Sequence, residues 1–174
     1  MKAQHPCFLV VDDSEDDRFL IVHALREHWK DTLHCVNSGN EAIRYLNGDA
    51  EFADRRKFPY PTIVMTDLKM PDGDGFHLLQ NLKKNPAWAV IPTIVLSASR
   101  NLDDVKHAYA LGASCYLHKP GKHADLNTLM GELIHFWDKC EVPEIDTEGK
   151  MLETHSTGKM GEHLPKFADK ETRD

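Results

Sequence analysis

Acidic, hydroxyl and lysine side chains follow short apolar runs at four places in this chain. Asp12 and Asp13 follow the first run, Asp67 follows the third, Ser97 closes the fourth, and Lys119 follows the fifth. If these runs are parallel strands, their carboxyl ends meet at one edge of a sheet, where the functional groups of such sheets gather. We therefore expect these side chains to lie close together.

Three carboxylates at one edge would need a cation. Two carboxylates about 4 Å apart repel by ~4 kcal/mol at an effective dielectric constant near 20. A site with only oxygen ligands and open positions suits Mg²⁺, which keeps bound waters and accepts phosphate oxygens. Lys119 adds a further positive charge, and Ser97 adds a hydroxyl donor. The residue types therefore predict a Mg²⁺ site that can accommodate a phosphate group.

Five apolar runs alternate with segments of helical periodicity. The runs are rich in Val, Ile and Leu without polar alternation, which is typical of strands buried on both faces of a parallel sheet. They are residues 7–11, 33–36, 63–66, 93–97 and 114–117. Five strand–helix units predict an α/β sandwich with helices on both faces of the sheet.

The first two helices have recognisable ends. Ser14 is a good N-cap for the first helix, whose predicted buried stripe extends from Leu20 to His28. The second helix is expected to begin at Ser38, with Glu41 completing a capping box, and to end near Gly48.

The other three helices follow from periodicity and stop signals. The third is expected at 74–84, where an Asn-Pro pair stops it, and the fourth at 102–111, where Gly112 suits a left-handed cap. The fifth has apolar residues at helical spacing over 126–137. From residue 141 onward aliphatic periodicity ceases, which predicts an acidic, flexible tail over 141–174.

Charge and hydropathy exclude several classes of protein. The 174 residues carry a formal net charge of −7, which argues against a nucleic-acid-binding surface. No apolar run approaches the roughly 18 residues of a membrane span, and the N-terminus has no apolar signal core. We expect a soluble, cytoplasmic protein that binds neither nucleic acid nor a membrane.

The four cysteines are far apart and form no zinc-binding pattern. Cys7, Cys35 and Cys115 lie in the strand-like runs, and Cys140 follows the last helix. Free, buried thiols in a reducing cytosol are the expected state.

Four motifs at the strand ends resemble the signatures of bacterial response-regulator receiver domains. They are FLVVDDS at 8–14, TDLKMPDGDG at 66–75, VLSAS at 95–99 and LHKP at 117–120. The resemblance covers about residues 7–140, with the motifs in the family's order and spacing. The ADRR and FPYP segments within 53–61 make the chain similar in particular to single-domain receivers associated with phytochrome-type kinases.

The resemblance implies a fold and a domain organisation. The expected fold is a flavodoxin-like, doubly wound sheet of five parallel strands in the order 2-1-3-4-5, with five helices. Residues 1–140 would form the receiver domain, and residues 141–174 would be its tail.

The resemblance also implies the acids and ligands of the site. Asp67 matches the phosphoacceptor, and Asp13 matches the acid that binds Mg²⁺ directly. Asp12 matches the neighbouring acid, which often acts through metal-bound water. The backbone carbonyl of Lys69 matches the remaining protein ligand.

Three further residues match groups that respond to phosphorylation. Lys119 matches the lysine that pairs with the acid and then with the phosphoryl group. Ser97 matches the catalytic and switch hydroxyl, and Tyr116 the switch aromatic. The resemblance implies a cis peptide bond between Lys119 and Pro120, an isomer that is realistic only before proline.

Each of these residues also has a purely structural interpretation. Asp12 could be a turn residue, and Tyr116 could serve packing alone. Asp16 and Asp17 are expected to be first-turn acids that suit the helix dipole and are not ligands. Asp72 is expected to be a loop residue.

The implied function is that of a single-domain response regulator of a two-component or phosphorelay system. It would accept a phosphoryl group from a sensor histidine kinase or a phosphotransfer protein and contact a downstream protein, or form a homodimer. It would not be an enzyme with an outside substrate, although it would assist its own phosphotransfer and slow dephosphorylation.

Three alternatives remain open. The first is a binding module that has lost phosphorylation. The second is a haloacid-dehalogenase-type hydrolase, which needs an Asp-x-Asp pair, whereas Ser14 stands two residues after Asp12. The third is a nucleotide-binding fold, which lacks support because no glycine-rich phosphate loop follows the first run.

Overall fold

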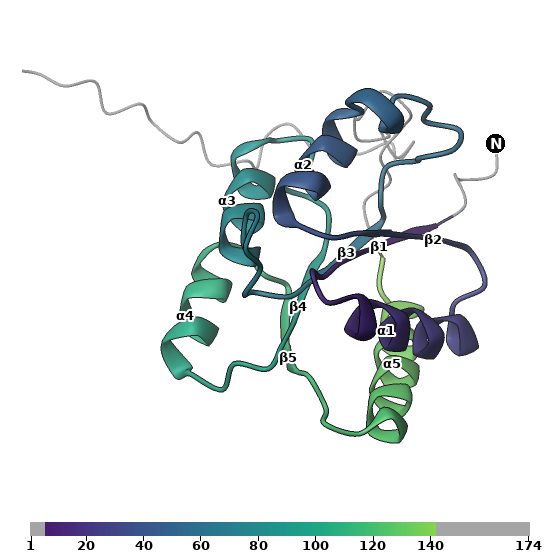
Figure 1. Cartoon of the computed structure of the whole chain (residues 1–174), viewed down its shortest axis with the longest axis vertical. Helices are drawn as coiled ribbons and strands as arrows, with labels where there is room; N and C mark the ends of the chain where they lie inside the picture. Colours follow the sequence, from purple (N-terminus) through teal and green to yellow (C-terminus); the bar gives the residue numbers. More distant parts are fainter. Residues whose placement is uncertain (1–5, 142–174) are drawn as a thin grey trace, which may run out of the picture.

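A parallel five-stranded sheet lies at the centre of the computed structural model, which describes residues 6–141 (Figure 1). The strands lie in the order β2-β1-β3-β4-β5. They are β1 (Cys7–Val11), β2 (Thr32–Val36), β3 (Ile63–Thr66), β4 (Thr93–Ser97) and β5 (Cys115–His118). The predicted doubly wound fold and strand order are confirmed.

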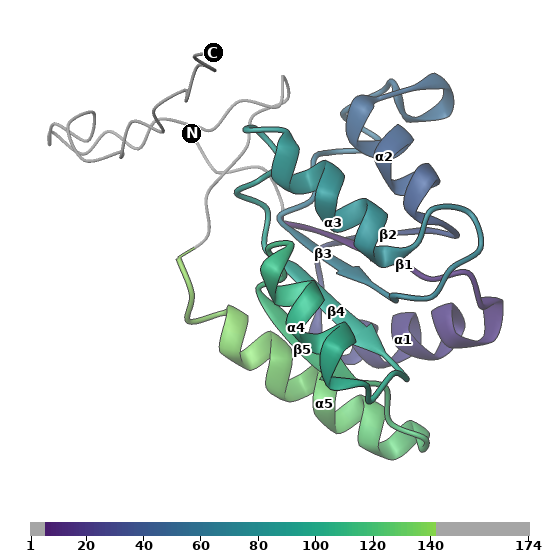
Figure 2. The ribbon, with the colours of Figure 1, turned by 90° about the vertical axis from the view of Figure 1, so that its left-hand side faces the viewer.

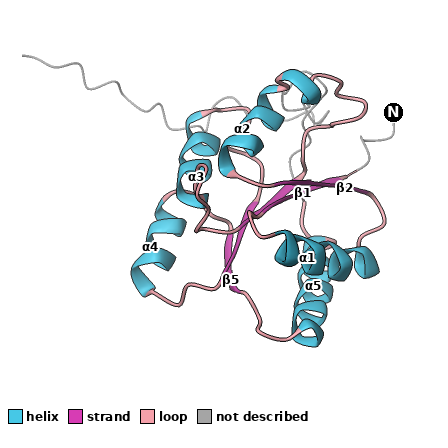
Figure 3. Cartoon of the chain, viewed as in Figure 1, coloured by secondary structure: helices cyan, strands magenta, loops and turns pink. Residues whose placement is uncertain are grey.

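Helices cover both faces of the sheet, as the perpendicular view in Figure 2 and the colouring in Figure 3 show. Helices α1 (Glu15–His28) and α5 (His123–Trp137) pack on one face. Helices α2 (Gly39–Asn47), α3 (Gly75–Lys84) and α4 (Leu102–Ala110) pack on the other. Within residues 6–141, no helix combines the length and the apolar character needed to cross a membrane.

The central strands are buried along their whole length. In β1, Phe8 and Val10 point into the core beneath α1 and α5, whereas Leu9 and Val11 point into the core beneath α2 and α3. Burying a side chain of this size contributes about 1.5–3 kcal/mol. The uninterrupted apolar pattern therefore suits the position of β1 inside the sheet, between β2 and β3.

The edge strands depart from the prediction that all strand-like thiols are buried. All four cysteines are free, and Cys7 in β1 is buried, which raises the pKa of its thiol to about 11. Cys115 and Cys140 are half-buried, and Cys35 is exposed. The prediction was wrong for Cys35 because β2 lies at the edge of the sheet.

The predicted helix ends agree well with the structure. Gly48 (φ 76°) and Gly112 (φ 95°) adopt the left-handed conformation that follows α2 and α4. Side-chain oxygens cap the starts of α1, α2 and α3, each by accepting a hydrogen bond from a backbone amide three residues later. The amide of Asp17 donates to Ser14 (3.2 Å), that of Glu41 to Ser38 (3.1 Å), and that of His77 to Asp74 (2.8 Å).

The buried face of α1 ends differently from the prediction. His28 is exposed, and its Nε2 lies 3.1 Å from the side-chain oxygen of Asn127 on α5. Trp29, which follows the helix, is buried instead and packs edge-on against Phe8 with ring centroids 5.6 Å apart. The prediction that His28 is buried was wrong because the imidazole pairs with a polar group at the rim of the α1–α5 contact.

The long connection between α2 and β3 has an apolar interior that its polar composition conceals. Phe52 of the short 3₁₀ turn η1 (Ala50–Phe52) is buried, and Phe58 packs with it against Tyr45 of α2. The guanidinium of Arg55 donates to the carbonyls of Tyr45 (2.8 Å) and Leu46 (2.6 Å), at the end of α2. The connection is therefore a docked part of the fold.

The expected domain boundary at residue 140 lies close to the end of the described part. Helix α5 ends at Trp137. Apart from residue 141, the predicted acidic tail lies outside the described residues, so its character stays a prediction.

Candidate functional site

The sheet itself holds the backbones of Asp12, Asp67 and Lys119. Each residue directly follows its strand, and its amide donates to the last carbonyl of a neighbouring strand. The three bonds are from Asp12 to Val36 (3.2 Å), from Asp67 to Val11 (3.0 Å) and from Lys119 to Ser97 (2.9 Å). These residues therefore extend the hydrogen-bond ladder at the carboxyl edge of the sheet.

The ammonium group of Lys119 joins three carboxylates at this edge. Its Nζ donates to Oδ2 of Asp12 (2.6 Å), Asp17 (2.8 Å) and Asp67 (3.0 Å). An ammonium has three donors, so all of them are engaged. The structure thus brings together side chains from the ends of β1, β3 and β5 and from the first turn of α1.

The cluster is largely shielded from solvent. The side chain of Asp12 is 2% exposed, and those of Asp67 and Lys119 are 13% exposed. Burial raises the pKa of Asp12, and the hydrogen bond and charge of Lys119 offset this only in part. Burial alone would lower the pKa of Lys119, but its bonds to Asp12 and Asp17 and the nearby charges raise that pKa well above its usual value.

The donor set fits a hard divalent cation. Three carboxylates share a single ammonium, so negative charge at the edge remains uncompensated. Among residues 6–141, the other carboxylate oxygens of Asp12 and Asp67 accept hydrogen bonds only from backbone amides, those of Ser14 (2.9 Å) and Leu68 (2.6 Å). Oxygen ligands with excess negative charge suit Mg²⁺ or a similar ion. Within residues 6–141, no three His, Cys, Asp or Glu side chains are already arranged to hold a metal ion, and the Lys119 ammonium contacts the carboxylates at this edge.

Two of the predicted metal ligands lie outside the lysine cluster. The side chains of Asp13 and Lys69 are both exposed. Within the described part of the chain, Lys119 pairs with Asp12, Asp17 and Asp67 but not with Asp13. Successive side chains of an extended backbone point to opposite sides, so the inward position of Asp12 turns Asp13 outward. Metal binding by Asp13 and by the Lys69 carbonyl stays a prediction.

Sequence reasoning missed Asp17 as a member of the site. The sequence indicated a first-turn acid that is not a ligand, and it gave no sign that the carboxylate of Asp17 accepts a hydrogen bond from Lys119. Asp16 is also an aspartate and lies in the same turn, yet it is exposed. Only the position of Lys119 relative to α1 distinguishes the two acids, and no local pattern contains that information.

The two predicted switch residues contact the same loop. Ser97 is buried at the end of β4, and its hydroxyl accepts from the Ser99 amide at 3.4 Å. The hydroxyl of Tyr116 donates to the Ser99 carbonyl at 2.9 Å, and the Tyr116 amide donates to the hydroxyl of Tyr109 at 3.2 Å. Ser97 and Tyr116 are therefore linked through the β4–α4 loop.

The loop that follows Asp67 is fastened to the start of α2. Asp72, which the sequence suggested was a plain loop residue, accepts from the Ser38 hydroxyl (3.0 Å) and the Asn40 side-chain amide (2.8 Å). The Gly39 amide donates to the Gly73 carbonyl at 2.8 Å. These bonds hold the β3–α3 loop in place.

The expected cis peptide bond before Pro120 is not found. No peptide bond within the described residues 6–141 is cis, so the Lys119–Pro120 bond is trans. The expectation was wrong, and the observed isomer is the one that is more stable by about 0.5–1 kcal/mol before proline.

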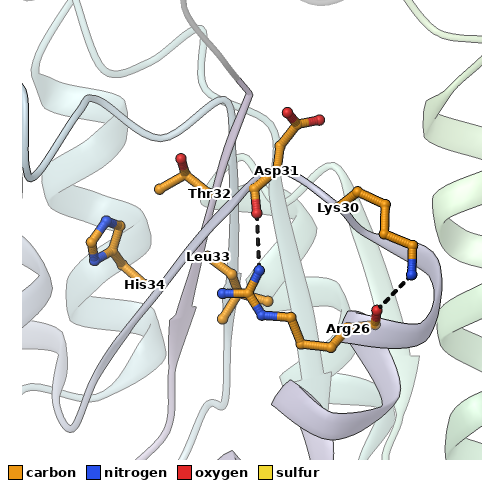
Figure 4. Close-up of a pocket in the computed structure, with 6 residues that line it drawn as sticks. All are labelled: Arg26, Lys30, Asp31, Thr32, Leu33 and His34. Atoms are coloured by element: carbon orange, nitrogen blue, oxygen red, sulfur yellow. Dashed lines mark hydrogen bonds between the residues drawn. The ribbon is translucent and has the colours of Figure 1, made fainter.

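A wide hollow of about 550 Å³ lies at the opposite end of the sheet (Figure 4). It is lined by residues at the end of α1 and the start of β2. Its cations are already engaged, since Arg26 donates to the Asp31 carbonyl (3.0 Å) and Lys30 to the Arg26 carbonyl (3.1 Å). This hollow is not part of the candidate site.

Comparison with known proteins agrees with the geometry. Response regulator Rcp1 of Synechocystis sp. (strain ATCC 27184 / PCC 6803 / Kazusa) is 33% identical over 130 residues, which are 74% of this chain and 86% of that protein. The crystal structure of the phosphorylated cyanobacterial phytochrome response regulator RcpA matches with a TM-score of 0.74 at 31% identity, over 81% of this chain and 100% of that one.

A second solved structure bears on metal binding. The Mn²⁺-bound form of Rcp1 matches with a TM-score of 0.71 at 31% identity, over 79% of this chain and 99% of that one. The family model described as the response regulator receiver domain matches residues 8–130 of this chain. With this match, the fold and the cluster of Asp12, Asp67 and Lys119, the chain belongs to the family of response-regulator receiver domains.

Proposed function

We propose that this chain is a single-domain response regulator that accepts a phosphoryl group on Asp67 in a Mg²⁺-dependent reaction. The observation that carries the proposal is the bond between the Lys119 ammonium and Asp67 Oδ2 (3.0 Å), in a shielded cluster that also contains Asp12. The Mn²⁺-bound form of the relative Rcp1 supports a divalent cation at this edge.

The chemistry is an in-line phosphoryl transfer. A carboxylate oxygen of Asp67 attacks the phosphorus of a phosphohistidine, and the P–N bond breaks with its electron pair passing to the imidazole nitrogen. The product is an acyl phosphate on Asp67. Lys119 then donates to a phosphoryl oxygen, and Ser97 supplies a hydroxyl donor. Mg²⁺, held by Asp12, Asp13, Asp67 and the Lys69 carbonyl, would neutralise charge on the phosphoryl oxygens.

The acyl phosphate changes the surface because it adds negative charge and strong acceptors. Ser97 moves toward the phosphoryl group, and Tyr116 exchanges its bond to the Ser99 carbonyl for an inward position. The surface formed by α4, β5 and α5 changes shape. This is a shift between two populations, driven by contacts made only when the phosphoryl group is present.

The proposed partners follow from this surface and from the relatives. The phosphoryl donor is a sensor histidine kinase, of phytochrome type by analogy with RcpA, or a phosphotransfer protein. Leu102 and Tyr109 on α4 and Phe136 on α5 are large, exposed side chains, which suit contact with a downstream protein or a second copy. In this proposal the protein acts in the cytoplasm and processes no outside substrate, although it assists its own phosphorylation and slow dephosphorylation.

Labelling with radioactive acetyl phosphate tests the proposal. Wild type should be labelled with Mg²⁺ and not with EDTA, and Asp67→Asn should not be labelled under either condition. Asp103→Asn, which changes an exposed acid on α4, should be labelled like wild type. If folded wild type takes no label, the alternative of a phosphorylation-independent binding module holds instead.

A further inference from the structure

Asp17 is the one partner of Lys119 to which the proposed reaction gives no task. It lies in the first turn of α1, and its Oδ2 is 2.8 Å from the lysine Nζ. Its side chain is 42% exposed, whereas that of Lys119 is 13% exposed. The contact thus closes the solvent side of the cluster.

The other two partners of Lys119, Asp12 and Asp67, change the groups that they bind during the proposed reaction. Asp67 would carry the phosphoryl group, and Asp12 would help to hold the cation. Asp17 belongs to neither set, so it can keep its bond to the ammonium from start to finish. One of the three donors of Lys119 is then always directed toward α1.

Among the described residues, those that line the cavity beside Lys119 include no other side chain that could replace Asp17 as an acceptor. A small cavity of about 40 Å³ lies beside the lysine, between α1 and α5, and it is lined by Asp17, Leu20, Ile21, Lys119, Pro120 and Leu126. Apart from the acid and the lysine, the side chains on its wall are apolar. Without Asp17, the ammonium would lose its acceptor on this side and would gain space in which to move.

The place of Asp17 is itself fixed. Its amide donates to the Ser14 hydroxyl at 3.2 Å, in the cap that begins α1. Ser14 donates its amide to Asp12 at 2.9 Å. The cap therefore links the carboxylate of Asp12 to the backbone of Asp17 through Ser14.

We propose that Asp17 is a positioning residue, which holds the Lys119 ammonium toward the phosphoryl site while the groups bound by Asp12 and Asp67 change. This inference rests on the proposed function. In this proposal the site extends to α1, because Asp17 takes part in it. The Asp17 carboxylate acts through Lys119 and contacts neither the phosphoryl group nor the reacting oxygen.

The test compares the rates at which variants are labelled at saturating acetyl phosphate and Mg²⁺. Asp17→Ala should be labelled about tenfold more slowly than wild type, because a misplaced catalytic group costs rate even when binding is intact. Asp17→Glu, which keeps a carboxylate, should recover part of the rate. Asp16→Ala removes an acid from the same turn and should match wild type, which controls for the helix dipole. Thermal unfolding of each variant reports whether it is folded.

A double-mutant cycle separates positioning from a general structural effect. In a Lys119→Ala background, the further change Asp17→Ala should leave the rate unaltered, because Asp17 acts through the lysine. Equal slowing in both backgrounds would overturn the inference, and so would a wild-type rate in Asp17→Ala alone. If wild type takes no label, the proposed function fails together with this inference, whereas a labelled wild type with an unaffected Asp17→Ala removes the inference alone.

Discussion

At the scale of single residues, close packing fixes Asp67 as firmly as hydrogen bonds do. Gly75 lies against the backbone of Asp67, the proposed phosphoacceptor. A Cβ atom at this position would stand 2.2 Å from the Asp67 carbonyl oxygen and 2.9 Å from the Leu68 Cα. These are backbone atoms and cannot rotate away, so the start of α3 can approach Asp67 this closely only with glycine.

We expect Gly75→Ala to lower the free energy of unfolding by about 1–3 kcal/mol, the usual cost of overpacking a filled site. Urea unfolding measures this change. Gly121→Ala is the matched control, because no atom of the described residues lies within 4 Å of the added Cβ, and it should stay within about 0.5 kcal/mol of wild type. Equal urea midpoints for the two variants would contradict the packing argument.

The residues of the site differ in how far sequence alone predicts them. Asp12, Asp67 and Lys119 directly follow strands β1, β3 and β5, so the rule that strand ends meet at one edge was enough to group them. Asp17 follows no strand. The Lys119 ammonium contacts its carboxylate because β5 places that lysine beside α1. Its contact depends on tertiary structure, which has no local signature.

At the scale of elements, the end of α2 depends on a residue from the connection that follows it. The last carbonyls of a helix have no partners within the helix. Arg55 supplies partners for two of them, at 2.8 Å from the Tyr45 oxygen and 2.6 Å from the Leu46 oxygen, and its guanidinium lies over the Tyr60 ring at 4.1 Å. This arginine thus joins α2 to the aromatic connection before β3.

We expect Arg55→Ala to destabilise the fold by about 1.5–3 kcal/mol, as is usual for hydrogen bonds to a charged group. The neighbouring Arg56 is the matched control, because its side chain is 93% exposed and its only ion pair within residues 6–141 is with Asp54 at 3.6 Å. Arg56→Ala should change stability by less than about 0.5 kcal/mol. Chemical denaturation of both variants measures the difference, and similar losses in the two would refute the assigned role of Arg55.

The elements were largely predictable, but their surroundings were not. Caps such as Ser14 and Ser38 act within a few residues, so their hydrogen bonds could be inferred locally. Whether an apolar strand lies in the centre or at the edge depends on the whole sheet, which is why Cys35 is exposed. The same limit applies to Arg55 and Arg56. The two are neighbouring arginines, and the sequence does not show which of them binds the end of α2.

At the scale of the whole molecule, helices cover both faces of the sheet, and the last of them, α5, ends at Trp137. One face carries the core beneath α1 and α5, and the other carries the cores beneath α2, α3 and α4. The alternation of strands and helices predicted this layered architecture. The strand order came from the resemblance to receiver domains, because alternation alone fits several orders.

Within the described part of the chain, the residues of all three cores lie at or before Trp137. A chain cut after Cys140 should therefore fold. We expect it to keep a cooperative thermal transition and to be labelled by acetyl phosphate at a rate similar to that of the full chain. Circular dichroism during heating and the labelling assay check the two parts. A truncated chain without a thermal transition would show that residues 1–140 do not suffice as a domain.

The central claim, that Asp67 carries the phosphoryl group, is tested most directly by locating the modification. After incubation with acetyl phosphate and Mg²⁺, borohydride reduces an aspartyl phosphate to homoserine, which peptide mass spectrometry can place in the sequence. We predict homoserine at position 67 and at no other aspartate, and none when Mg²⁺ is removed. Homoserine at another position, or its absence from folded wild type, would contradict the account.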